Sequence, residues 1–87
     1  MCVLGLTVQV LNIPPMVTVS DLKLFFSYCG FTENIWLQRN DKDRTQMGYV
    51  TFRQPYAFRT ALLLDGVNIG GCPVRIIPLR CLEVYIS

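Results

Sequence analysis

The sequence predicts an α+β domain in which two helices cover one face of a four-stranded antiparallel sheet. Two observations lead to this prediction. Strand-like and helix-like segments follow one another in the order βαββαβ between residues 8 and 77, and 52% of the 87 residues are apolar while 16% are charged. A chain of this length and composition folds as one domain around one core, without room for a deep cleft between two lobes.

The first segments along the chain are a strand and a helix. Residues 8–13 (VQVLNI) alternate in character, are rich in β-branched residues, and end at a pair of prolines. Thr18 or Ser20 is suited to cap the helix that follows, and the helix dipole favours Asp21 in its first turn. The helix ends at Gly30, and its predicted core face consists of Leu22, Phe25, Phe26 and Cys29.

Two strands and a charged loop come next. Residues 32–38 (TENIWLQ) are predicted to form the second strand, and residues 46–53 (QMGYVTFR) the third, because both segments contain β-branched and aromatic residues. The loop between them, residues 39–44, holds five of the fourteen charged residues. We expect it to be the solvated tip of a hairpin.

The last third of the chain contains the second helix and the last strand. Pro55 suits the first turn of a helix that runs to about Leu64. Gly70 and Gly71 are predicted to form a turn, and residues 73–77 (PVRII) a strand that Pro78 ends. Residues 80–87 are apolar enough to pack against the domain, as a fifth short strand or otherwise.

This order of elements predicts the ferredoxin-like βαββαβ sandwich. Right-handed crossovers place the first and third strands together in the middle of the sheet, with both helices on one face and the other face open. We expect a single domain over residues 1–87, with its core at 6–79 and residues 80–87 folded beside or across the open face. The fold itself serves many unrelated functions.

The composition also argues against several classes of function. The chain has no histidine, which is the commonest general base and metal ligand, and we expect no enzyme, no cofactor and no metal. A net charge of +2 is too small to favour electrostatic capture of nucleic acid or of a membrane, and no apolar run is long enough to span one. The cysteines form no C-x-x-C pair and no secretory signal is visible, so we expect a reduced, intracellular protein, cytoplasmic or nuclear.

Alternation along the strands assigns side chains to the two faces of the sheet. The face beneath the helices is predicted to hold Val8, Val10, Ile35, Leu37, Val50, Phe52, Val74 and Ile76. The open face is predicted to hold Gln9, Leu11, Asn34, Trp36, Gln38, Met47, Tyr49, Thr51, Arg75 and Ile77. Five of these ten are large and apolar, which is more than a monomer usually leaves uncovered. We therefore expect a base, a partner protein or the chain's own tail to cover this face.

Two segments resemble the signature of the RNA recognition motif. Residues 8–13 match its first-strand hexamer, and residues 45–52 (TQMGYVTF) match its third-strand octamer of basic, glycine, aromatic, small, aromatic, aliphatic, any and aromatic residues. The helix segments DLKLFFSYCG and AFRTALLLDG also resemble the family, so that the resemblance covers roughly residues 6–79. It implies a non-enzymatic module that binds single-stranded RNA on the open sheet face.

Departures from the family pattern predict that RNA binding is weak. Of the three sheet positions where the family stacks bases on aromatic rings, Tyr49 keeps its ring, while Gln9 and Met47 replace the others. Each lost stacking ring removes about 1–3 kcal/mol per base. Trp36 is either a substitute stacking ring or a residue that packs against the tail at Leu82, Val84 or Tyr85.

Polar and charged residues complete the predicted RNA site. Asn12 belongs to the matched hexamer, and Arg44 stands beside Thr45, which replaces the basic residue of the octamer. Asp41 and Asp43 nearly cancel the basic residues of their loop, so Arg75 on the sheet face is expected to be the better-placed cation.

The non-aromatic hexamer together with the YVTF third strand is similar to one branch of the family in plants. This Vip1-like group includes the binding partner of the "accelerated cell death" lipid-transfer protein. The resemblance implies protein interaction and the control of programmed cell death. A protein partner is therefore the alternative to RNA.

Two apolar pairs on the outer side of the helices give a protein partner a candidate surface. Leu24 and Tyr28 lie outside the predicted core face of the first helix. Phe58 and Leu62 are expected outside the second, whose inward positions are predicted to be Ala57, Thr60, Ala61 and Leu64. Either these pairs lie flat over the edge of the core or they form a docking surface.

Overall fold

The computed structural model describes residues 6–40, 42 and 44–79. The longer strands are β1 (Thr7–Ile13), β2 (Thr32–Asn40), β3 (Thr45–Phe52) and β6 (Arg75–Pro78). The helices are α1 (Val19–Phe26) and α2 (Pro55–Leu62), and a short hairpin consists of β4 (Asn68–Ile69) and β5 (Cys72–Pro73). The predicted C-terminal extension, residues 80–87, lies outside the described residues, and so do its expected contacts with Trp36.

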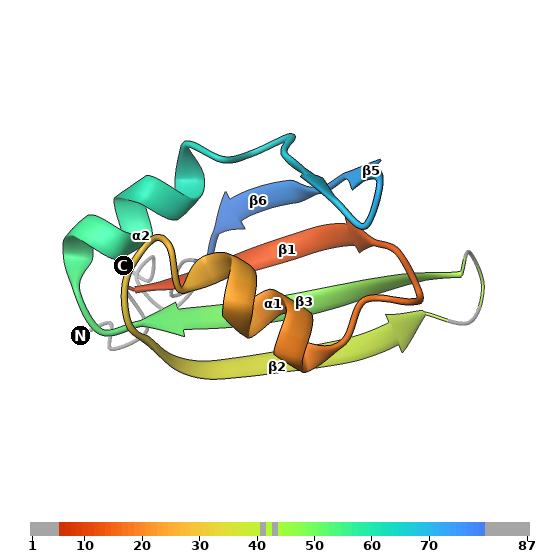
Figure 1. Ribbon diagram of the computed structural model, residues 1–87, viewed down its shortest axis with the longest axis horizontal. Coiled ribbons are helices and arrows are strands. Elements are labelled where there is room, and N and C mark those ends of the chain that lie inside the picture. The colour runs from red at the N-terminus through yellow and green to blue at the C-terminus, as the bar shows by residue number, and fades with distance from the viewer. Residues whose placement is uncertain (1–5, 41, 43, 80–87) are drawn as a thin grey trace, which may run out of the picture.

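The four longer strands form one antiparallel sheet in the order β2-β3-β1-β6. Both helices lie on the face of the sheet that is turned towards the viewer in Figure 1. The predicted ferredoxin-like fold is therefore confirmed. Because β1 and β3 are the central strands, the hexamer and the octamer lie side by side in the middle of the sheet.

The first helix begins at a reciprocal cap. Thr18 is the N-cap residue: its side-chain oxygen accepts a hydrogen bond from the backbone N–H of Asp21 at 3.2 Å, and the Asp21 carboxylate accepts one from the Thr18 N–H at 2.9 Å. This arrangement selects Thr18 over Ser20. Both helices have eight residues and end earlier than predicted, at Phe26 and Leu62, with single turns continuing towards Cys29 and Leu64.

Residues 68–73 form a short hairpin, β4–β5, where the sequence predicts only a turn at Gly70 and Gly71. Gly70 and Gly71 both have positive φ, 64° and 89°, which glycine adopts without strain, and they reverse the chain between the two short strands. The last strand of the main sheet consequently starts at Arg75 and not at Pro73.

The core lies between the sheet and the helices, and alternation predicted its strand residues well. Six of the eight predicted strand positions are fully buried, and the remaining two, Ile35 and Leu37 on the edge strand β2, pack partly buried against the core. From α1 the core receives Leu22 and Phe26, with Phe26 edge-on to Phe52 at 6.0 Å between ring centroids.

The inward face of α2 differs from the prediction. Ala57 and Ala61 are buried as expected, but Thr60 is exposed and its hydroxyl donates to the backbone oxygen of Tyr56. Phe58 and Leu62, which were expected outside, are partly buried against the core. The two alanines allow the helix to approach the sheet closely, so that the larger side chains beside them also reach the core edge.

One polar side chain, that of Gln46, is buried at the end of β3. It is 6% exposed, and its Nε2 donates to the backbone oxygens of Pro14 and Val17, both at 2.8 Å. These two bonds fasten the connection between β1 and α1 to the third strand. No helix within the described residues is long and apolar enough to cross a membrane.

Asp65 protects the outer edge of β6. Its Oδ1 accepts the backbone N–H of Ile76 at 2.8 Å and the Nε of Arg75 at 3.1 Å. The backbone hydrogen bond and then the Arg75 guanidinium hold the pKa of the Asp65 carboxyl below its usual value. The carboxylate therefore stabilises the native state above the unfolded pKa of about 4, and this contribution is lost as the pH falls through the native pKa.

We expect Asp65→Asn to lower stability at neutral pH, and the difference from the unchanged chain to disappear in acid. Urea unfolding at neutral pH and in acid below the native pKa of Asp65 measures both values, since protonation removes the charge that the substitution removes. A difference that stays the same at both pH values would show that the charge of Asp65 contributes nothing to the edge.

Candidate nucleic-acid interface

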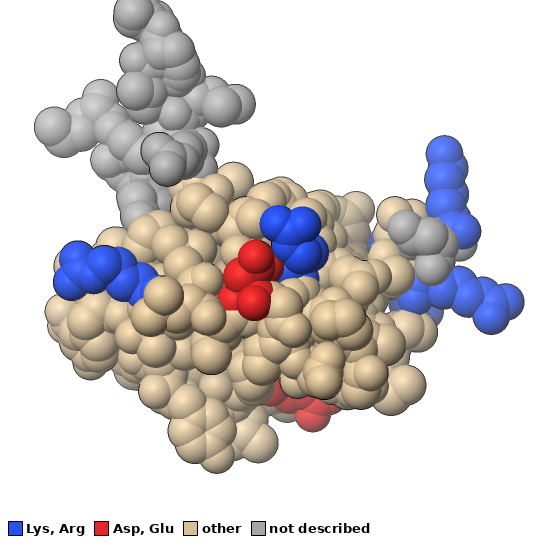
Figure 2. Space-filling view, turned by 90° about the horizontal axis from the view of Figure 1, so that it is seen from above, with Lys and Arg blue, Asp and Glu red and all other residues tan. Residues whose placement is uncertain are grey.

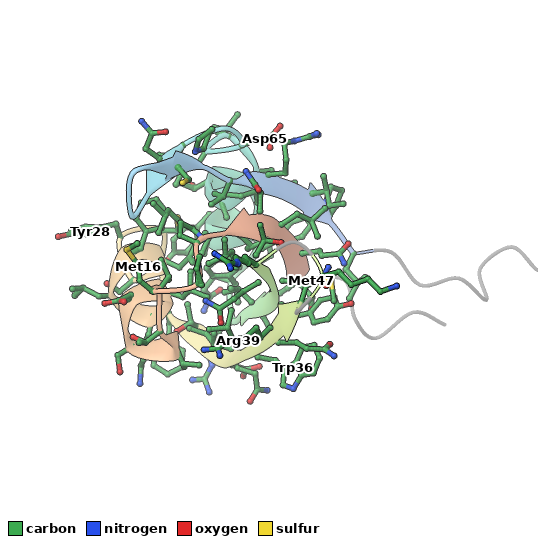
Figure 3. All side chains as sticks on the ribbon, turned by 90° about the vertical axis from the view of Figure 1, so that its right-hand side faces the viewer. Met16, Tyr28, Trp36, Arg39, Met47 and Asp65 are labelled. Carbon is green, nitrogen blue, oxygen red and sulfur yellow. The ribbon has the colours of Figure 1, made fainter. Side chains whose placement is uncertain are left out.

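Two aromatic rings stack on the open face of the sheet. Trp36 on β2 and Tyr49 on β3 are direct cross-strand partners, with ring centroids 5.4 Å apart and planes inclined by 26°. Trp36 is 50% exposed. Tyr49 is partly buried, and its strand lies between β2, which carries Trp36, and β1. Figure 3 shows Trp36 and Met47 on the opposite side of the sheet from Tyr28 and the helix layer. The structure thus supplies Trp36 with a ring partner within the sheet.

Gln9 occupies the centre of the open face, opposite Tyr49 on β3 and Ile77 on β6. Its Nε2 lies 3.0 Å from the Met47 sulfur and 3.5 Å from the Tyr49 hydroxyl. These contacts bring together three of the predicted RNA-binding residues, but the flat surface here consists of an amide and a thioether in place of two rings. An amide and a thioether present a smaller planar surface than the aromatic pair on the half with Trp36.

A pocket opens beside the ring pair, where the sheet meets the β2–β3 turn. It has a volume of about 650 Å³, and Leu11, Asn12, Gln38, Asn40, Lys42 and Met47 are among its lining residues. We call it the hairpin pocket. Alternation identified Leu11, Gln38 and Met47 as open-face residues, but not that the tip of the hairpin adds Asn40 and Lys42 to them.

Asn12 lines the hairpin pocket and also holds two parts of the backbone together. It has φ 65° within the irregular end of β1, where the register with β3 shifts between Val10 and Ile13. Its Nδ2 donates to the backbone oxygen of Pro73 at 2.8 Å and so connects β1 to the β4–β5 hairpin. Only its remaining polar groups are available to a ligand.

The basic residues lie at two places. Arg75 is on an open-face register position opposite Leu11, and its Nε donates to Asp65 Oδ1 at 3.1 Å in an exposed ion pair. Arg39 and Lys42 line the hairpin pocket, and Arg44, with φ 60°, lines a second hollow of about 220 Å³ together with Pro15, Arg39 and Asn40. In Figure 2, basic side chains gather at the right-hand end, which carries the β2–β3 turn in Figure 1.

The predicted protein-partner residues fall into two groups. Leu24 on α1 and Tyr28 in the turn that follows it are exposed, by 68% and 84%, as the helical spacing predicted. Phe58 and Leu62 belong to the core edge and do not form a matching pair on α2. Among the described residues no group of three or more potential metal ligands occurs. Burial raises the pKa of the Cys29 thiol, which disfavours its reactive thiolate form.

Comparisons with known proteins agree with these observations. A family model described as RNA recognition motif matches residues 8–75. Protein vip1 of Schizosaccharomyces pombe is 38% identical over 69 residues, which cover 79% of this chain and 26% of that protein. Binding partner of ACD11 1 from Arabidopsis thaliana is 38% identical over 70 residues, or 80% of this chain and 26% of that protein. The chain spans about a quarter of the length of these relatives.

Solved structures show the same fold at low sequence identity. The third RNA recognition motif of Mip6 has a TM-score of 0.83 at 16% identity and covers 90% of this chain and 96% of its own. The Rna15 motif with bound GU RNA has a TM-score of 0.75 at 16% identity and covers 94% of each chain. Since the family model covers most of the described sheet and helices, and the relatives include the predicted Vip1-like branch, the chain belongs to the RNA recognition motif family.

Proposed function

We propose that this domain binds single-stranded RNA on its open sheet face, with the stacked pair of Trp36 and Tyr49 as the principal contact. The exposed ring pair carries the proposal, because a half-exposed indole beside a phenol offers an unpaired base a face on which to stack. The pair spans β2 and β3, and it compensates in part for the missing ring at Gln9 on β1. We also propose that the domain is a binding module without catalytic activity. We propose that it acts inside the cell.

The same surface supports weak binding. Two of the three family stacking positions carry Gln9 and Met47, and Arg75 is engaged by Asp65. The available cations, Arg39, Lys42 and Arg44, lie at one end of the molecule, so few phosphates are contacted at once. We therefore propose an affinity in the micromolar range or weaker at physiological salt.

A titration of the chain into end-labelled, mixed-sequence single-stranded RNA, followed by fluorescence anisotropy at low and physiological salt, tests this proposal. We expect micromolar or weaker binding that weakens further with salt, and little competition from a duplex of the same sequence, whose bases are not free to stack. Nanomolar binding would show that the replaced rings matter little. Equal competition by the duplex would exclude the ring pair as the main contact.

A protein partner on the outer side of α1 is a second candidate, because Leu24 and Tyr28 are both strongly exposed there. The names Polyadenylate-binding protein-interacting protein 11 and Binding partner of ACD11 1, borne by two relatives, refer to protein partners of those proteins. We propose that a partner of the present chain would depend on Tyr28 and show weak salt dependence. For the whole protein, we further propose a role in the control of programmed cell death, which the resemblance to the Vip1-like branch implies.

A further inference from the structure

The hairpin pocket lies one step from the ring pair along the same two strands. Gln38 and Met47 are cross-strand partners, and each lies two residues nearer the β2–β3 turn than Trp36 and Tyr49 do, a distance of about 7 Å along the strands. Leu11 and Met47 form a partly buried apolar floor, while Gln38, Asn40 and Lys42 form a polar rim. The volume of about 650 Å³ lies within the range of about 300–1,000 Å³ that is usual for small-ligand sites.

The orientation of one rim amide is fixed by the backbone. The N–H of Lys42 donates to the Asn40 Oδ1 at 3.0 Å, so the amide oxygen is engaged in the turn and the Nδ2 group, which only donates, remains for a ligand. The Lys42 ammonium also only donates. The Gln38 side chain has no hydrogen-bond partner among the residues that the structure describes, and it can present either its oxygen or its nitrogen.

This pattern distinguishes two classes of base. At C4 or C6 of the pairing edge, uracil and guanine carry a carbonyl oxygen next to a ring N–H, whereas cytosine and adenine carry an amino group next to a ring nitrogen acceptor. A fixed donor at Asn40 matches a carbonyl at this position, and the adjustable Gln38 amide can accept from the ring N–H. Against an amino group at the same position, the fixed donor at Asn40 has no acceptor to meet.

We infer that the hairpin pocket is a base-selective subsite that takes a base with a carbonyl at C4 or C6, uracil or guanine, beside the base stacked on Trp36. Asn40 is the residue that determines this preference, and Lys42 supports it. The inference rests on the proposed RNA binding, and it adds a sequence preference that the ring pair by itself does not provide, because stacking accepts every base.

Oligouridine and oligocytidine of equal length test the inference, because the two pyrimidines are of the same size and differ on the edge that the pocket would read. We expect the unchanged chain to bind oligouridine about fivefold more tightly, which corresponds to one net hydrogen bond. Asn40→Asp keeps the oxygen that accepts from Lys42 but replaces the donor with an acceptor. This substitution should abolish or reverse the ratio of the two affinities.

Asn34→Asp is the matched control. It introduces the same charge on the same strand, at a position that does not line the hairpin pocket, and it should weaken both oligomers while keeping their ratio. Equal affinities in the unchanged chain, or a ratio that survives Asn40→Asp, would overturn the inference while the proposed RNA binding stands. If neither oligomer binds, the proposed function fails, and this inference fails with it.

Discussion

Gln46→Glu is expected to lower the free energy of unfolding strongly at neutral pH. The side chain of Gln46 is buried, and its Nε2 donates to two backbone oxygens, those of Pro14 and Val17. A carboxylate at this place would face two acceptors without a proton to donate. The expected loss of about 3 kcal/mol or more is a large part of the stability of a small domain, about 5–15 kcal/mol.

Urea unfolding followed by the fluorescence of the single tryptophan measures this loss. Burial raises the pKa of the introduced carboxyl, so the loss should be smallest below about pH 4, where the native and unfolded states are both protonated, and should grow as the pH rises. Gln38→Glu makes the same chemical change on the exposed surface of β2 and should cost little. Equal, small losses for both substitutions would mean that the Gln46 amide does not hold the β1–α1 connection.

The alternation along β3 also places Gln46 on the face of the sheet that is turned towards the core. Residues 46, 48, 50 and 52 share one face of β3, and Val50 and Phe52 on that face are fully buried. Position 46 was not recognised as buried because a glutamine can be buried only where two acceptors meet its amide. Those acceptors are backbone oxygens about 30 residues earlier in the chain, and no local pattern reveals them.

Helix faces were harder to predict than strand faces. A strand alternates strictly, so six predicted core positions are fully buried, but the boundary between the inside and the outside of a short helix depends on how closely it packs. With Ala57 and Ala61 against the sheet, Phe58 and Leu62 reach the core edge. On α1, where Leu22 and Phe26 fill the contact, Leu24 and Tyr28 remain outside, as predicted.

The site was predicted residue by residue, but its arrangement required the register of the strands. Trp36 meets Tyr49 only because the β2–β3 pairing aligns these two positions, and the sequence left open whether Trp36 stacks or packs against the tail. The Arg75–Asp65 pair is another case, since it joins a strand to the end of a helical turn. The positions of the basic side chains depend on the strand register and on the path of the loops, and the composition of the chain does not reveal either.

The largest functional effect is expected from removing the ring pair. Trp36→Ala should weaken binding to single-stranded RNA by about fivefold or more, because one stacked base contributes about 1–3 kcal/mol, while Trp36→Phe should retain much of the affinity. Tyr49→Ala should have a comparable effect. Anisotropy with end-labelled RNA measures each variant, and it does not depend on the fluorescence of Trp36, which the first two variants lack.

The double variant shows whether the two rings act as one surface. The rings are in contact, at 5.4 Å between centroids, so the loss for Trp36→Ala with Tyr49→Ala should be smaller than the sum of the single losses. Tyr28→Ala removes a more exposed ring on the helix layer and should leave RNA affinity unchanged. Additive losses would indicate two separate stacking sites. If instead Tyr28→Ala weakens RNA binding and Trp36→Ala does not, the RNA lies on the helix side, and the open face is left to a protein.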